Sequence, residues 1–149
     1  MKIAWSPLLS LLIVCCVVSA TMGQSGQRDA KAEKRLFNHK SVEKAWEAAI
    51  AGKKPLLVMF TSDHCVFCQK MLTQTYGHPA IKQMLIGRTE SVLAHASDYS
   101  ELVQKMGLRG FPTSLLISPE GKVLAVMEGF VEPRDFAQQV KPLLEKKAT

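Results

Sequence analysis

The stretch "LLVMFTSDHCVFCQK", residues 56–70, places a short continuous apolar run a few residues before two closely spaced cysteines. A run such as residues 56–60 is typical of a strand that is buried on both faces, as in a sheet covered by helices. If a helix begins near Cys65, Cys68 follows almost one turn later and lies on the same face. The segment therefore predicts a buried strand leading into a helix that carries a cysteine pair.

The chemistry of thiols allows three uses of this pair. As a structural staple it is weak, because closing about four residues stabilises the fold by only about 2 kcal/mol in the loop-entropy model. As a metal site it is incomplete, because structural zinc takes four ligands and the sequence has no second Cys/His pair at short spacing. A copper or zinc site would need ligands from the four histidines, which are His39, His64, His78 and His95.

As a redox pair the two cysteines are well placed. A sulfur in the first turn of a helix lies near unpaired backbone N–H groups and the positive end of the helix dipole, and both stabilise a thiolate. Cys65 would occupy that position. Cys68 can then attack a mixed disulfide formed at Cys65 and release the captured partner.

The first twenty residues have the composition of a secretory signal peptide. Met1 and Lys2 supply a positive start, residues 3–18 are apolar apart from two serines and a proline, and small residues lead to a cleavage point after Ala20. A membrane span takes about 20 apolar residues, and this run is shorter and interrupted. We therefore expect a cleaved signal peptide at residues 1–20, a periplasmic or secreted protein, and no membrane span after cleavage.

Two cysteines in this leader, Cys15 and Cys16, raise the alternative of lipid attachment. Val14 disfavours it, because it is bulkier than the residue usually accepted before a lipid-modified cysteine. Retention as an uncleaved anchor is a further alternative. Cleavage would leave Cys65 and Cys68 as the two cysteines of the mature chain, and oxidising surroundings would favour their disulfide.

The composition indicates a single globular domain behind a leader. The chain has 149 residues, of which 47% are hydrophobic and 21% are charged. The net charge is +6, but the lysines are scattered singly and in pairs, without interleaved aromatic residues. This pattern indicates a solvated surface and no nucleic-acid partner.

After the leader, residues 21–35 are typical of a flexible linker, and residues 36–149 predict one α/β domain with a mixed sheet between helices. A last helix begins near Pro133, and Pro142 is expected to kink it or to end its first segment. Two other predicted helices cover residues 41–52, with Ser41 as N-cap and Gly52 as stop, and residues 98–106. Two more helices are predicted to begin near residues 65 and 78. The other predicted strands cover residues 91–94, 113–118 and 122–127.

From about residue 36 to residue 147, the chain resembles the thioredoxin family. The buried strand and the CxxC pair are followed by "GFPT", residues 110–113, then by a predicted β-hairpin and a C-terminal helix. The resemblance implies a thioredoxin-like fold with Cys65 as the attacking cysteine and Cys68 as the resolving one.

The same resemblance assigns roles to three further residues. Pro112 would follow a cis peptide bond and lie against the disulfide, and Phe111 would present its backbone to an extended substrate. Phe67 and Phe111 would form an apolar rim for extended or unfolded partners, although local packing is the alternative. Thr73 stands where many family members have a proline that kinks the helix.

By resemblance the chain is an exported protein-disulfide oxidoreductase of the thiol–disulfide interchange kind. Its partners would be protein thiols and disulfides and a separate redox donor or acceptor, with no cofactor beyond its own disulfide. Val66 and Phe67 add no charge between the cysteines, which favours a reductase or isomerase over a strong oxidant. Two alternatives stay open, a copper or zinc binding module on the same fold and a structural relic with an inert disulfide.

The residues around the cysteines depart from the family's usual pattern. His64 replaces a tryptophan and is our candidate modulator, because its protonated form would favour a thiolate at Cys65. Met59 replaces an acid that many members carry on the strand. Proton transfer to and from Cys68 would then need another route, through water or through Asp63, which equally suits a loop.

Overall fold

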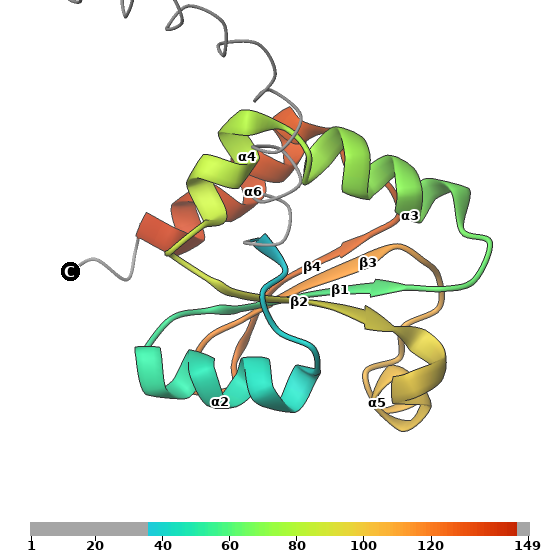
Figure 1. Ribbon diagram of the computed structural model, residues 1–149, viewed down its shortest axis with the longest axis horizontal. Coiled ribbons are helices and arrows are strands. Elements are labelled where there is room, and N and C mark those ends of the chain that lie inside the picture. Colours follow the sequence, from blue (N-terminus) through green and yellow to red (C-terminus); the bar gives the residue numbers. More distant parts are fainter. Residues whose placement is uncertain (1–35, 146–149) are drawn as a thin grey trace, which may run out of the picture.

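The computed structural model describes residues 36–145, which form a four-stranded mixed sheet covered by helices on both faces (Figure 1). The strands are β1 (Leu56–Thr61), β2 (Glu90–His95), β3 (Thr113–Ile117) and β4 (Val123–Glu128). Their order is β2-β1-β3-β4, with β1 parallel to β2 and antiparallel to β3, and β3 antiparallel to β4. The predicted α/β class is confirmed, and every predicted strand lies within one residue of its expected bounds.

The helices form one layer on each face of the sheet (Figure 1). One layer contains α2 (Val42–Gly52), a 3-10 turn (Ala96–Tyr99) and α5 (Ser100–Lys105). The other layer contains α3 (Val66–Lys70), a π-helical turn (Met71–Thr75), α4 (Pro79–Leu85) and α6 (Pro133–Glu145).

β1 is an inner strand whose side chains alternate between two hydrophobic cores. Leu57 and Met59 pack in the core beneath α3, α4 and α6. Leu56, Val58 and Phe60 pack in the core beneath α2 and α5. All five are at most 1% exposed, which explains the continuous apolar run in the sequence.

The predicted start of α2 at the Ser41 cap and its predicted end at Gly52 are both confirmed. The Ser41 side chain accepts a hydrogen bond from the backbone N–H of Lys44 (3.3 Å) and so caps the first turn. Gly52 is the last helical residue. The left-handed residue that ends the helix is Lys53, with φ 51°.

α3 continues directly into the π-helical turn, which apolar spacing does not predict. The Thr73 hydroxyl in this turn donates to the carbonyl of Gln69 in α3 (2.9 Å). A Cβ at Gly77 would collide with the Thr73 carbonyl oxygen, so the backbone approach here leaves room for glycine alone.

α6 runs through Pro142 as one helix, so the predicted end of a first segment at this residue is wrong. Phe136, Val140 and Leu144 form one buried face of the helix on both sides of the proline. Pro142 itself is exposed. Packing of the buried face therefore holds the last turn, while the hydrogen bond that proline removes is lost on the solvent side.

A buried tyrosine links the sheet to the helices above it. The ring of Tyr76 packs edge-on against Phe37 and Phe136, with centroids 5.1 and 5.3 Å away. Its hydroxyl donates to Ser114 Oγ (2.8 Å) on β3. Burial raises the pKa of Tyr76 well above its usual value, and the Ser114 hydrogen bond opposes this only in part.

A short segment before α2 runs beside the outer edge of β2. His39 forms an isolated parallel bridge with Val92, and its backbone N–H donates to the carbonyl of Ser91 (3.4 Å). The predicted signal peptide (1–20) and linker (21–35) lie outside the described residues. Within residues 36–145, no helix is both long and apolar enough to cross a membrane.

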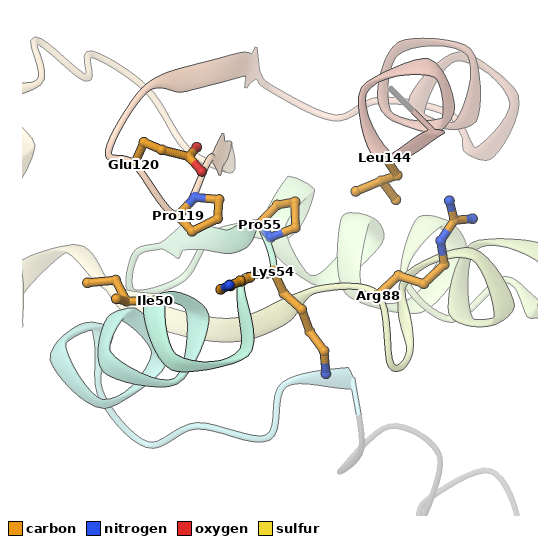
Figure 2. A pocket seen from close by; sticks show the side chains of 8 residues that line it. Ile50, Lys54, Pro55, Arg88, Pro119, Glu120 and Leu144 are labelled. Atoms are coloured by element: carbon orange, nitrogen blue, oxygen red, sulfur yellow. The ribbon is translucent and has the colours of Figure 1, made fainter. Parts of the chain in front are cut away.

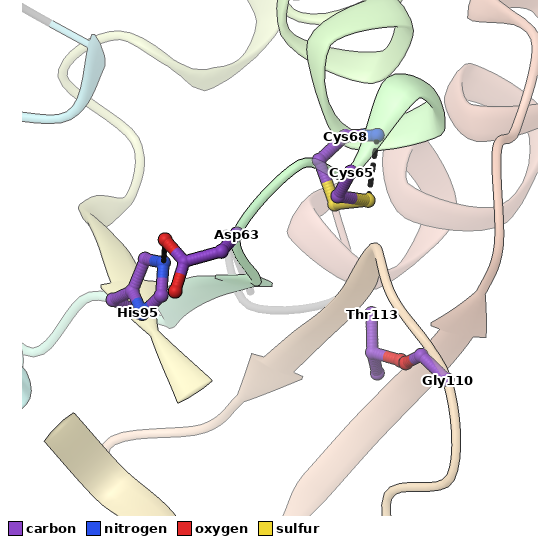
Figure 3. Close-up of a disulfide and its surroundings, with 6 residues drawn as sticks. All are labelled: Asp63, Cys65, Cys68, His95, Gly110 and Thr113. Carbon is purple, nitrogen blue, oxygen red and sulfur yellow. Dashed lines mark hydrogen bonds and ion pairs between the residues drawn. A yellow bond between two sulfur atoms is a disulfide. The ribbon is translucent and has the colours of Figure 1, made fainter. Parts of the chain in front are cut away.

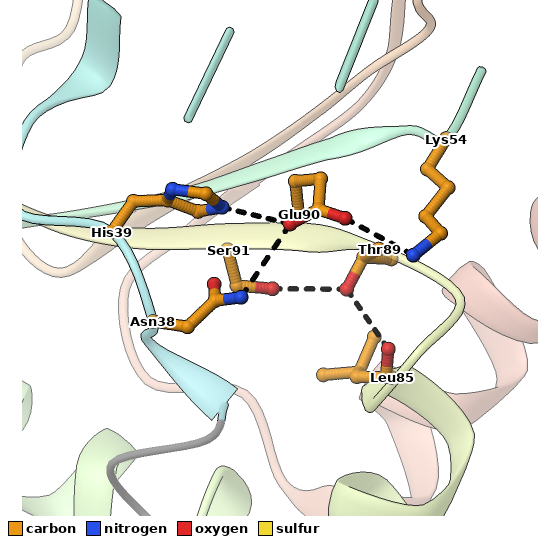
Figure 4. Close-up of polar contacts among 7 residues, drawn as sticks. All are labelled: Asn38, His39, Lys54, Leu85, Thr89, Glu90 and Ser91. Carbon is orange, nitrogen blue, oxygen red and sulfur yellow. Dashed lines mark hydrogen bonds and ion pairs between the residues drawn. The ribbon is translucent and has the colours of Figure 1, made fainter. Parts of the chain in front are cut away.

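Glu90, the first residue of β2, gathers three donors from separate parts of the chain (Figure 4). Its carboxylate is bonded to His39 Nε2 (2.7 Å), Lys54 Nζ (3.1 Å) and Asn38 Nδ2 (3.5 Å). Burial by itself would raise the pKa of Glu90. The hydrogen bonds from His39, Lys54 and Asn38 and the charge of Lys54 outweigh burial, so the pKa is lowered.

An open cleft of about 670 Å³ lies at the end of the sheet where β1 begins (Figure 2). Its lining comes from four parts of the fold and comprises Ile50, Lys53, Lys54, Pro55, Arg88, Pro119, Glu120 and Leu144. The cysteine pair follows the far end of β1, so this cleft is not part of its surroundings.

Candidate functional site

The loop after β1 delivers Cys65 to the start of α3 (Figure 3). Cys65 is the N-cap residue, and its sulfur accepts a hydrogen bond from the backbone N–H of Cys68 (3.1 Å). A disulfide joins the two cysteines, whose Cα atoms are 5.2 Å apart. The predicted helix start near Cys65 is confirmed, and the sulfur lies among the N–H groups that a helix leaves unpaired at this end.

The two bonded sulfurs belong to residues that differ in accessibility. Cys65 is partly exposed, whereas Cys68 is 0% exposed and packs in the core that contains Met59 and Met71. In the part of the chain that the structure describes, the fully buried polar side chains are hydroxyl groups, with no carboxylate among them. Solvent therefore reaches Cys65, while Cys68 is sheltered in the core.

The "GFPT" segment lies at the same end of the sheet as the disulfide (Figures 1 and 3). The peptide bond between Phe111 and Pro112 is cis. The Thr113 hydroxyl donates to the Gly110 carbonyl (2.7 Å), and the Gly129 N–H donates to the Pro112 carbonyl (2.7 Å). Pro112 is buried and Phe111 is partly buried against both cores, so the segment is held firmly.

The side chains next to Cys65 are solvent-exposed. Phe67 is 59% exposed and Val66 is 76% exposed, so an apolar surface adjoins the disulfide. His64 is also exposed, and its backbone has φ 55°, which is uncommon for a residue other than glycine. The sequence indicates only that Val66 adds no charge, because one valine in a short helix gives no signal of exposure.

Asp63 and His95 form an ion pair beside the cysteine loop (Figure 3), with Asp63 Oδ1 and His95 Nε2 3.1 Å apart. The parallel pairing of β1 with β2 sets Thr61 opposite His95 and so brings the two side chains together. The other ring nitrogen of His95 is 2.8 Å from Ser97 Oγ. Sequence reasoning noted Asp63 only as a proton route to Cys68 and missed its partner.

Three of the four histidines considered as extra metal ligands are engaged elsewhere. His39 bonds Glu90, His95 bonds Asp63, and the ring of His78 accepts the backbone N–H of Ala80 (3.2 Å) at the start of α4. No group of three or more His, Cys, Asp or Glu side chains suited to a metal occurs among residues 36–145.

A family model for the thioredoxin-like domain matches residues 42–143, a range that contains the whole sheet and the cysteine pair. The chain belongs to the thioredoxin-like domain family. The family assignment made from the sequence is therefore confirmed.

Individual relatives agree with this assignment. The thiol:disulfide interchange protein DsbD of Vibrio vulnificus (strain YJ016) is 24% identical over 128 residues, which cover 82% of this chain and 21% of DsbD. The chain thus spans about a fifth of the length of that relative.

Two solved structures support the fold. A thioredoxin from Thermus thermophilus aligns with a TM-score of 0.65 and 22% identity, over 70% of this chain and 85% of that one. The DsbH oxidoreductase aligns with a TM-score of 0.61 and 25% identity, over 73% of this chain and 85% of that one. The predicted thioredoxin-like fold is confirmed.

Proposed function

We propose that the protein is an exported thiol–disulfide oxidoreductase that exchanges its Cys65–Cys68 pair with protein thiols and disulfides, in the reducing or interchange direction. Its family and its closed CxxC pair make it a thioredoxin-like disulfide oxidoreductase. The observation that carries the proposal is the contrast between a partly exposed cysteine at a helix start and a fully buried cysteine bonded to it.

In the reducing direction, the reaction begins with the Cys65 thiolate. It attacks one sulfur of a substrate disulfide, forms a mixed disulfide and releases the first substrate sulfur as a thiolate, which takes up a proton. Cys68 then loses its proton and attacks the Cys65 sulfur, which releases the second substrate thiolate. Two electrons pass to the substrate, and the Cys65–Cys68 disulfide closes. A separate thiol donor reopens it.

The structure bears on how Cys68 loses its proton. Met59 lies fully buried where many family members carry an acid, and the described core offers no carboxylate in its place. The Asp63 carboxylate is bonded to His95 and points away from the disulfide (Figure 3). We therefore assign this proton transfer to water that enters with the substrate or to the departing substrate thiolate.

The exposed side chains around the pair suit contact with a polypeptide. Val66 and Phe67 offer an apolar surface, and Pro112 and Phe111 form a fixed segment at the same end of the sheet. We assign substrate contact to this surface. We assign modulation of the Cys65 thiolate to His64, whose position directly before Cys65 lets a positive charge favour ionisation.

The names of the relatives support thiol–disulfide exchange as the type of reaction. DsbD is named as a thiol:disulfide interchange protein and DsbH as an oxidoreductase. The apolar leader at residues 3–18 supports export. We propose a periplasmic or secreted location, with a separate redox donor as partner.

Insulin reduction tests the proposed activity. The wild-type chain should turn over insulin in the presence of a thiol donor, and C65S should lose at least about 1000-fold in rate because the attacking sulfur is gone. The matched variant C68S should also lose turnover but should accumulate mixed disulfides with its substrates at Cys65. Turnover that persists in C65S would exclude the mechanism, and a reduction potential above about −150 mV would exclude the reducing direction.

A further inference from the structure

The loop between β1 and α3 is held by a contact on each side of a single residue. On one side, Asp63 bonds His95 at the end of β2 (3.1 Å). On the other, the Cys65 sulfur accepts the N–H of Cys68 (3.1 Å). His64 lies between them in a left-handed conformation, which persists only where the surroundings hold it.

His95 is well placed to hold Asp63, because both of its ring nitrogens have hydrogen-bond partners. Nε2 faces Asp63, and Nδ1 faces Ser97 Oγ, which in turn donates to Asp98 Oδ1 (3.3 Å). When the Ser97 hydroxyl donates to Asp98, its oxygen can accept from His95. Both ring nitrogens of a cationic His95 then donate, one to Asp63 and one to Ser97. With a neutral ring, the Ser97 hydroxyl turns its proton to Nδ1, and Nε2–H still donates to Asp63. The ring therefore keeps its contact with Asp63 in either form.

The contact matters for Cys65 because Asp63 is only two residues away along the chain. A carboxylate near a thiol opposes formation of the thiolate, and a cation paired with that carboxylate offsets the effect. Figure 3 shows the Asp63 side chain turned away from the disulfide and toward His95. Asp63 itself is 80% exposed, so apart from His95 little restrains its orientation.

We propose that His95 is a positioning residue of the redox site. It holds the Asp63 carboxylate away from Cys65 and, when protonated, counterbalances its charge, and so keeps the Cys65 thiolate favoured. Among the polar contacts of His95, the charged groups are Asp63 from the loop, which bonds the ring directly, and Asp98 from the 3-10 turn, which is linked to the ring through Ser97. The inference rests on the proposed function, since a favoured thiolate matters only for thiol exchange.

A double-mutant cycle in the full chain tests this. The rate of alkylation of Cys65 by iodoacetamide is measured against pH in the reduced C68S background, alone and with H95Q, D63N or both. D63N removes the charge but keeps an oxygen that accepts from His95. H95Q should slow alkylation at mildly acidic pH about threefold, D63N should not slow it, and H95Q added to D63N should have a smaller effect than H95Q alone, because the part of the His95 effect that acts through Asp63 is then gone.

A second readout uses the intact cysteine pair. H95Q should change the equilibrium constant with glutathione about threefold in favour of the disulfide, which lowers the reduction potential by about 14 mV. The control E47Q removes one negative charge on the exposed side of α2 and should leave both readouts unchanged.

The inference is overturned if H95Q leaves the alkylation profile unaltered, or if it slows alkylation equally with and without D63N. Alkylation of Cys65 needs no disulfide substrate, so the proposed function and the proposed role of His95 can be refuted independently. Lack of insulin turnover by the wild-type chain would overturn the proposed function, whereas an unaltered H95Q profile would overturn only the role of His95.

Discussion

Two histidine–carboxylate pairs lie at opposite ends of β2, and they differ in burial. At its start, Glu90 bonds His39 and Lys54, and the Glu90 side chain is only 13% exposed. At its end, His95 bonds Asp63, which is 80% exposed. Exposed ion pairs add little to stability, because water solvates both partners well and their side chains lose freedom. The first pair therefore contributes to the stability of the fold, and the second to the geometry and charge of the cysteine loop.

The largest effect on stability is expected from E90Q. The substitution keeps the shape of the side chain but removes the charge that accepts from His39 and Lys54. We expect the free energy of unfolding to fall by about 1–2 kcal/mol in urea denaturation at neutral pH. The control E47Q should stay within about 0.5 kcal/mol of wild type. A loss in E90Q no larger than in E47Q would remove the contrast between the two ends of β2.

Acid should weaken the Glu90 contribution in a defined direction. The pKa of Glu90 is lowered in the folded state, whereas glutamate in an unfolded chain titrates near pH 4.3. The contribution is therefore complete above about pH 5 and is lost as the pH falls through the folded pKa. The difference in unfolding free energy between wild type and E90Q should shrink between about pH 5 and pH 3. A difference that grows in acid would contradict this assignment.

The smallest effect on stability is expected from D63N. Its carboxylate is largely in water, so loss of the charge should change the free energy of unfolding by less than about 0.5 kcal/mol. The same urea measurement used for E90Q checks this. A loss as large as that of E90Q would show that the exposed pair also supports the fold.

The parts of the fold that rest on local pattern could be predicted from the sequence. The run at residues 56–60 marks a strand buried on both faces, and Ser41 marks a helix start, because each signal lies within a few neighbouring residues. The position of Cys65 at the start of α3 follows from the same short segment.

The parts that depend on tertiary contact could not be predicted in this way. The Asp63–His95 pair exists only because β1 and β2 run parallel and end together. The helix continues through Pro142 because its buried face packs on both sides, which outweighs the local preference of proline. The contrast between Cys65 and Cys68 likewise arises from the core beneath α3, since the two residue types are identical.

The bridge between His39 and Val92 has a consequence for how the chain behaves when it is shortened. β2 is an outer strand, and such a strand can recruit a strand from another molecule when its backbone groups are left open. The segment before α2 covers part of the open edge of β2 and so hinders such strand pairing. Proteolysis just ahead of Ser41 would expose the edge of β2 and favour polymers built by strand addition, even though every residue of the redox site would be retained.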